Sequence, residues 1–315
     1  MRSNLENRYR ALLRVALPGW YRAEREEEMV GLFLADRTDE LDLEHGWPGW
    51  GEAGATVALG VRTRFAASGA PARTVALGDV VRLVALIGVL VQGAYGTQGL
   101  LSMLPVPLAE GDRLVAEVDP FTVVALVSDL AMLVGAVAMV TGFRTTAKVL
   151  FGLLSALFLV GVGRDAGPEV VLGLLWQLPV WVTTAALLAG FHRDAPTPAP
   201  GRWRWALAGA VLGAGALTAG NLLAYPHVVF ALTSMVLVPV AVLVAGVAHL
   251  ARRGGPVGAL GLGWWLVVLL PVEVVYAAYS VPPVAELVAA MAVVGVALLV
   301  VGLRGLRRPA AAITP

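Results

Sequence analysis

The sequence predicts an all-α protein, a polytopic membrane bundle of about eight transmembrane helices with a small cytoplasmic helical head at its N-terminus. Hydrophobic residues make up 58% of the 315 residues and charged residues 14%, whereas a soluble domain is about half apolar and about a quarter charged. The stretch Leu83 to Leu104 carries no formal charge and, at about 1.5 Å per residue, can cross a hydrocarbon layer of about 30 Å. Of the 22 acidic residues, 12 precede Arg82, so residues 1–79 are expected to face water.

The first part of this head is expected to be a hairpin of two helices. Apolar residues recur at helical spacing from Leu5 to Leu17, and Pro18-Gly19 interrupts the pattern. A second helix begins near Trp20 and carries its apolar residues after an acidic run, which suits the earlier part of a helix. The two apolar stripes can bury each other.

A third, weaker helix is expected over residues 50–65. Val57, Val61 and Phe65 fall on one side of it, with two arginines nearby. Such a helix lies along a membrane surface with its arginines at the lipid headgroups, or it remains a charged helix in solvent.

Residues 9–37, YRALLRVALPGWYRAEREEEMVGLFLADR, resemble the N-terminal helical segment that precedes the spans in many actinobacterial integral membrane proteins. They are also similar to the permease-prefix segments of some transporter permeases and to the helical signalling domains encoded beside PadR-like repressors. The resemblance implies a cytoplasmic adaptor or regulatory head and carries over no catalytic residue. The alternative is a hairpin that only helps insertion or packs under the membrane domain. The matching positions are Tyr9, Leu12, Leu13, Arg14, Leu17, Pro18, Tyr21, Arg22, Glu28, Met29 and Phe33.

The membrane domain is expected over residues 80–303, where apolar runs of span length recur. Residues 304–315 would form a short tail. The predicted spans are Leu83 to Leu104, Phe121 to Phe143, Thr146 to Gly163, Val170 to Phe191, Ala206 to Ala224, Val228 to Leu250, Ala259 to Tyr279 and Ala285 to Leu303.

Charges between these spans predict the orientation. The N-terminus lacks the continuous apolar core of a secretory signal, so the head should stay where it is made. With the head inside, cytoplasmic segments hold ten lysine and arginine residues and external loops hold two, Arg113 and Arg164. We therefore expect a multi-pass protein of the plasma membrane with both termini in the cytoplasm.

Ionisable side chains inside spans are the default candidates for a site, because they are costly in lipid. Asp129 and Glu273 both fall in the outer half of their spans, and Gln98, Gln177 and Asn221 lie on the same side of the midplane. Depth alone therefore predicts a polar cavity open to the outside.

Two prolines lie next to polar residues of this predicted site, and the two acids also have a purely structural explanation. Pro179 follows Gln177 and Pro271 precedes Glu273, and a proline weakens the helix around it, as in a transport hinge. The alternative is that Asp129 is neutral or paired and that Glu273 snorkels to the surface. Gln92 is expected to make an interhelical hydrogen bond.

Small residues of the fifth span are expected to admit a neighbouring helix at close range. They are Gly209, Gly213, Ala216 and Gly220.

Several classes of function are not expected. The chain has no cysteine, which excludes disulfides, thiolate metal sites and cysteine nucleophiles. It contains no HExxH, GxSxG or phosphate-loop motif, and its four histidines are scattered. The formal net charge of +1 gives no basic excess for nucleic acid. We expect no enzyme, cofactor or metal.

Two functions stay open. In the first, the protein is a regulatory or accessory membrane component, and its head binds a cytoplasmic protein partner. In the second, it is a small-solute or ion-coupled transporter that uses Asp129 and Glu273. Besides the lipid bilayer, a second copy of the chain is a candidate partner. The candidate partner-binding residues of the head are Tyr9, Leu13, Tyr21, Arg22, Glu28, Met29 and Phe33.

Overall fold

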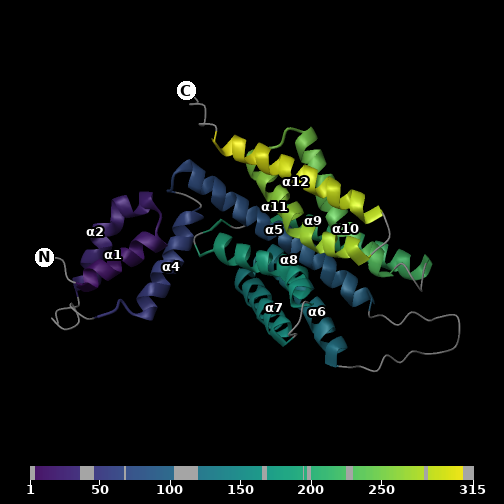
Figure 1. The fold of residues 1–315 in the computed structure, drawn as a ribbon, viewed down its shortest axis with the longest axis horizontal. Helices are drawn as coiled ribbons and strands as arrows, with labels where there is room; N and C mark the ends of the chain where they lie inside the picture. Colours follow the sequence, from purple (N-terminus) through teal and green to yellow (C-terminus); the bar gives the residue numbers. More distant parts are fainter. Residues whose placement is uncertain are drawn as a thin grey trace. The chain divides into compact units, whose positions relative to one another are not determined.

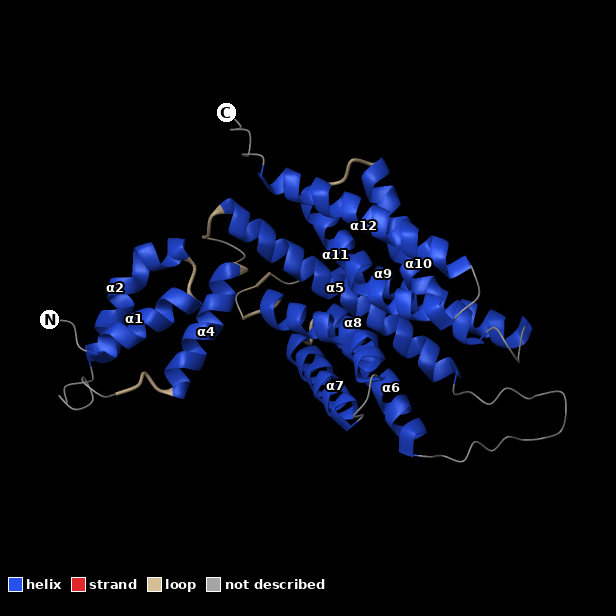
Figure 2. Cartoon of the chain, in the orientation of Figure 1, coloured by secondary structure: helices blue, strands red, loops and turns tan. Residues whose placement is uncertain are grey.

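The computed structural model describes residues 4–35, 46–66, 69–102, 120–164, 169–193, 195–196, 200–224, 230–279 and 283–307. Within these residues all regular structure is α-helical (Figures 1 and 2). The chain divides into two compact units. The N-terminal unit comprises residues 1–79 and 192–195, and the membrane unit comprises residues 80–191 and 196–315.

The N-terminal unit begins with the predicted hairpin. Helices α1 (Asn4–Ala16) and α2 (Gly19–Ala35) pack against each other, with the turn at Leu17 and Pro18. Their apolar stripes meet as expected, and the rings of Tyr9 and Phe33 stack with centroids 3.9 Å apart. The shared core consists of Leu5, Tyr9, Leu13, Leu17, Val30 and Phe33.

Helix α4 (Trp50–Arg64) packs on α1 through a face of small side chains. Thr56, Gly60 and Thr63 are buried, whereas Val57 is exposed. A Cβ atom at Gly60 would collide with the carbonyl oxygen of Ala16, so the two helices approach too closely for a larger residue. The face that packs on α1 is thus a different one from the side that carries Val57, and the sequence patterns did not indicate it.

Each of the remaining helices overlaps one of the predicted spans. They are α5 (Ala72–Ser102), α6 (Pro120–Thr141), α7 (Arg144–Arg164), α8 (Glu169–Gly190), α9 (Pro200–Ala224), α10 (Phe230–Ala251), α11 (Pro256–Tyr279) and α12 (Pro283–Arg307). Within the described residues, 6 helices are long and apolar enough to cross a membrane, namely α5 to α8, α11 and α12. This is the structure of a multi-pass integral membrane protein. Helices α9 and α10 occupy the fifth and sixth predicted spans, and the total of eight spans stays a prediction.

Helix α5 contacts neighbours on several sides of the membrane unit, and Figure 1 shows it passing between α6 to α8 and α11 to α12. Its glycines make this possible. Gly88 faces Thr183 of α8 and Trp265 of α11, while Gly96 faces the backbone of Asp129 in α6. The indole Nε1 of Trp265 donates a 2.7 Å hydrogen bond to the carbonyl oxygen of Val84 and ties α11 to α5.

Candidate functional site

Glu273 lies in the interior of the membrane unit. Its side chain on α11 is 0% exposed, so the expectation that it snorkels to the surface was wrong. Neither carboxylate oxygen has a hydrogen-bond partner within the part of the chain that the structure describes. Tyr95 of α5 interacts with it electrostatically. A fully covered acid without a described hydrogen-bond partner is costly, so Glu273 is a candidate functional residue.

Asp129 occupies a different environment on α6. Its side chain is half-buried, and its carboxylate lies directly against Gly99 of α5. Only a residue without a Cβ atom leaves room for the carboxylate there. The α5 glycine and the α6 acid therefore form one packed contact.

The contacts along α5 place the predicted polar residues in depth. Asp129 lies beside Gly99, which places this acid near the level of Gln98. Thr183 of α8 packs on Gly88 of α5. On α8, Gln177 lies six residues before Thr183, which corresponds to about 9 Å along the helix. Gln177 is half-buried and lies close to the same depth. Asn221 belongs to α9, but its side chain lies outside the described residues.

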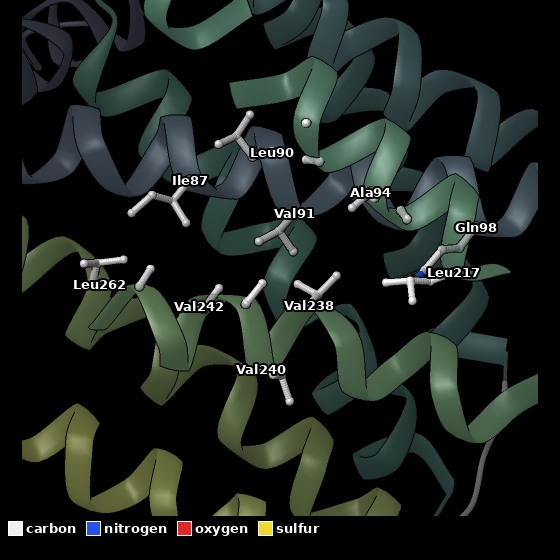
Figure 3. A pocket seen from close by; sticks show the side chains of 16 residues that line it. Ile87, Leu90, Val91, Ala94, Gln98, Leu217, Val238, Val240, Val242 and Leu262 are labelled. Atoms are coloured by element: carbon white, nitrogen blue, oxygen red, sulfur yellow. The ribbon is translucent and has the colours of Figure 1, made fainter. Parts of the chain in front are cut away.

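A shared depth does not create a shared cavity. The membrane unit contains a cavity of about 500 Å³ between α5, α9 and α10 (Figure 3). Of the polar residues predicted from the sequence, Gln98 lines it, and Asp129, Gln177 and Glu273 are not among its described lining residues. The described walls are otherwise aliphatic or glycine, so they offer no group for acid–base chemistry or ion coordination.

Two buried amides of α5 lack partners at their nitrogen atoms. Gln92 is 1% exposed and Gln98 is 6% exposed. Neither Nε2 atom has a hydrogen-bond partner among the described residues. For Gln92, the expected interhelical hydrogen bond is thus absent at this atom. For Gln98, the amide reaches one end of the cavity beside Leu217, with Ile87 and Leu262 at the other end (Figure 3).

Two residues of the small-residue face of α9, Gly209 and Gly213, line the same cavity. A Cβ atom at Gly209, Gly213 or Gly220 would meet nothing within 4 Å. The close helix approach expected at these glycines therefore does not occur in the described structure. Gly215, on another face, is the α9 glycine that contacts Thr97 and Leu101 of α5.

The N-terminal unit has a groove of its own, of about 320 Å³, between α2 and α4. We call it the α2–α4 groove. Its walls include Trp20, Tyr21, Glu24, Arg25 and Arg62. Aromatic and arginine side chains are the residue types that contribute most to protein–protein binding.

The candidate partner-binding residues fall into two groups. Tyr9, Leu13 and Phe33 belong to the core of the N-terminal unit, so they support its shape. Tyr21 lines the α2–α4 groove, and half-buried Met29 borders a second hollow of about 280 Å³ with Tyr9 and Phe33. Arg22 pairs with Glu26 at 3.6 Å, and Glu28 is an exposed partner of Arg25 at 2.7 Å.

Arg10 of α1 is a buried charge that the sequence patterns did not indicate. Its Nη1 and Nη2 atoms each donate a 2.7 Å hydrogen bond to Glu27 of α2, and its Nε donates to Glu6 at 2.9 Å. Glu26 accepts a further bond at 3.3 Å. These carboxylates, Glu27 first, raise the pKa of the Arg10 guanidinium above its ordinary value. The fork-to-fork contact with Glu27 fixes α2 against α1. The acidic run of α2 could have indicated this network, because a basic side chain on a helix that packs against α2 is needed to pair with its carboxylates.

No group of three or more histidine or acidic side chains is arranged to hold a metal ion in the described ranges. No family model matches the chain, and no curated protein or solved structure matches it either. The geometry of the two units is therefore the basis for the function proposed below.

Proposed function

We propose that this protein is a regulatory or accessory component of the membrane whose N-terminal unit binds a protein partner in the cytoplasm. The observation that carries the proposal is the α2–α4 groove, where Trp20, Tyr21 and two arginines line one hollow. The resemblance of residues 9–37 to adaptor-like segments points in the same direction. No catalytic role is part of the proposal.

The charges of the groove indicate the chemistry of the partner. Among its described lining residues, Arg25 and Arg62 lie together with one acid, Glu24. The Nε atoms of Trp20 and Arg62 have no hydrogen-bond acceptor within the described residues. A partner segment that offers carboxylates beside an apolar side chain would supply acceptors and fill the aromatic wall. We therefore propose an acidic, partly apolar peptide segment as the bound element.

The transporter alternative depends on Glu273 and Asp129. Its support is the full burial of Glu273 without a described partner, because intramembrane acids mark ion pathways in many transporters. The described lining of the large cavity, which includes neither acid, favours the regulatory role.

A photo-crosslinking experiment tests the regulatory proposal in the full-length protein in its host membrane. A photoreactive amino acid replaces Glu24 in the groove or, as a control, exposed Arg14 on α1. We expect one defined adduct from position 24 and none of that mass from position 14. The charge reversal Arg62→Glu should reduce the adduct at least tenfold, whereas Arg14→Glu should leave it unchanged.

Equal adducts from both positions, or an adduct that survives Arg62→Glu, would contradict the groove as the binding site. The alternative has its own readout in vesicles that contain the full-length protein and a trapped pH-sensitive dye. A proton flux that disappears in the Asp129→Asn, Glu273→Gln double variant, with the adduct at position 24 intact, would favour transport.

A further inference from the structure

The cavity between α5, α9 and α10 has the dimensions of a site for a slender molecule. On α5 its lining runs from Ile87 to Gln98, which corresponds to about 16 Å of helix. Its volume of about 500 Å³ lies within the usual range of about 300–1,000 Å³ for small-molecule sites. The cavity is therefore long and large enough for one hydrocarbon chain.

The walls show which chemistry would fit. Aliphatic side chains such as Leu90, Val91 and Val242 line most of the length. Gln98 is the single polar side chain among the described lining residues, and it is 6% exposed with no partner for its Nε2 atom in that part of the chain. An occupant that is apolar along its length and carries one hydrogen-bond acceptor at one end would satisfy both features.

The cavity can be reached from the lipid. Gly213 and Leu217 of α9 and Ala241 of α10 line it and are also exposed on the surface of the membrane unit. Gly209 and Gly213 keep the space open, because a Cβ atom at either position would meet nothing within 4 Å. A chain could thus enter sideways from the bilayer.

We infer that this cavity binds one acyl chain of a membrane lipid, with the ester carbonyl of that lipid accepting a hydrogen bond from Nε2 of Gln98. Half of a hydrocarbon layer of about 30 Å is about 15 Å, which matches the length of the cavity. Gln98 lies six residues, or about 9 Å, inside the external end of the predicted span at Leu104, so the bound lipid would have its ester drawn into the hydrocarbon layer. The inference is independent of the partner proposed for the N-terminal unit.

The test uses the full-length protein in nanodiscs that contain a phospholipid with a photoreactive diazirine in its acyl chain. After illumination, mass spectrometry should find adducts on cavity residues of α5, α9 or α10. Native mass spectrometry after washing with detergent should find one retained lipid per chain. The ester-linked lipid should be retained about three- to tenfold better than its ether-linked analogue, which lacks the carbonyl acceptor.

Three variants decide the outcome. Gly213→Leu should fill the cavity and reduce the cavity adducts at least tenfold, while Gly161→Leu, at an exposed α7 glycine with equally open surroundings, should not. Gln98→Leu should abolish the preference for the ester lipid without abolishing retention. If Gly213→Leu does not fold, Ala241→Phe fills the cavity from α10.

Cavity adducts that persist in the filled variants, or that fall equally in Gly161→Leu, would overturn the inference. Equal retention of ester and ether lipids by the unaltered protein would overturn the role of Gln98. A dimer without retained lipid in native mass spectrometry would show that a second copy covers the cavity, and would also refute the inference.

Discussion

Arg10 in the N-terminal unit and Glu273 in the membrane unit are both covered by protein, yet their surroundings differ. Three carboxylates surround the guanidinium of Arg10, and the one on Glu27 accepts two parallel hydrogen bonds. The carboxylate of Glu273 has no hydrogen-bond partner in the described bundle. One unit uses its buried charge to join two helices, whereas the other contains a buried acid that joins no described group.

The two units also differ in how their helices meet. In the hairpin of the N-terminal unit, large side chains such as Tyr9 and Phe33 fill the space between α1 and α2. Along α5, glycines let backbones come together, as at Gly96 and Asp129. Lipid is as apolar as the helices, so burial of apolar surface drives association weakly there, and close van der Waals contact becomes more important. Because close contacts at glycines already hold these helices together, a buried polar group such as Glu273 is not required for their packing.

The largest expected effect comes from closing the α5–α6 contact. At Gly96, a Cβ atom would lie 2.5 Å from the backbone oxygen of Asp129 and 3.2 Å from the backbone nitrogen of Leu133, and backbone atoms cannot rotate away. We expect Gly96→Leu to destabilise the membrane unit by about 3 kcal/mol or more. The measurement is thermal unfolding of the full-length protein in detergent, followed by size-exclusion chromatography.

Gly152→Leu on α7 is the matched control, since a Cβ atom there meets nothing within 4 Å. It adds the same side chain to a membrane helix and should leave the melting temperature nearly unchanged. Similar losses in both variants would mean that glycine is needed for a reason other than the close α5–α6 approach.

The second effect should come from breaking the compensated charge. Arg10→Met leaves Glu27 and Glu26 without their shared partner, and removal of one member of a buried ion pair costs about 3–5 kcal/mol. The side chain of Glu27 is 79% exposed, so water screens this pair and we expect a smaller cost of about 2 kcal/mol. Far-ultraviolet circular dichroism and limited proteolysis between α1 and α2 would report it.

Arg25→Met is the control, because Arg25 makes an exposed ion pair with Glu28. It should change the protease sensitivity of the hairpin little. If Arg10→Met destabilised the hairpin no more than this control, the Arg10 network would contribute no more than a surface ion pair. Arg10 and Glu273 could then not be contrasted as a paired and an unpaired buried group.

The sequence predicted the elements better than their faces. Hydropathy and helix breakers located α1, α2 and the helices that cover the predicted spans, because these signals are local. The packing face of α4 was not predicted, because hydrophobicity marks Val57, which is exposed, whereas the close approach to α1 occurs at Gly60. Position along the spans predicted that Asp129 and Glu273 lie at similar depth. Which side chains face the cavity depends instead on the rotation of each helix about its axis, and this rotation brings Gln98, but neither acid, into the described lining. Rotation depends on contacts between distant segments, such as Trp265 with Val84.

A smaller effect of opposite sign should come from removing the uncompensated charge. Glu273→Met replaces a covered carboxylate without described partners by an apolar side chain of similar size. We expect stabilisation by about 1–2 kcal/mol, because a buried polar group without hydrogen bonds costs about that much. The melting temperature should rise by about 2–4 °C. A fall in melting temperature would show that Glu273 binds an ion, water or a side chain outside the described residues, as the transporter alternative requires.

The smallest effect concerns a polar contact that the membrane unit does satisfy. The hydroxyls of Ser155 on α7 and Thr184 on α8 lie 2.8 Å apart and share a hydrogen bond. Interhelical bonds of this kind contribute about 0.6 kcal/mol on average, because each hydroxyl can bond to its own helix when the partner is lost. Thr184 already has such a fallback, since its hydroxyl also lies 2.9 Å from the carbonyl oxygen of Val180. A double-mutant cycle of Ser155→Ala and Thr184→Val, read by thermal unfolding, should therefore give a coupling energy below about 1 kcal/mol. A coupling of several kcal/mol would mean that paired polar groups stabilise the membrane unit as strongly as Arg10 stabilises the hairpin. The two units would then differ only in the polar groups without described partners, namely Glu273 and the glutamines of α5.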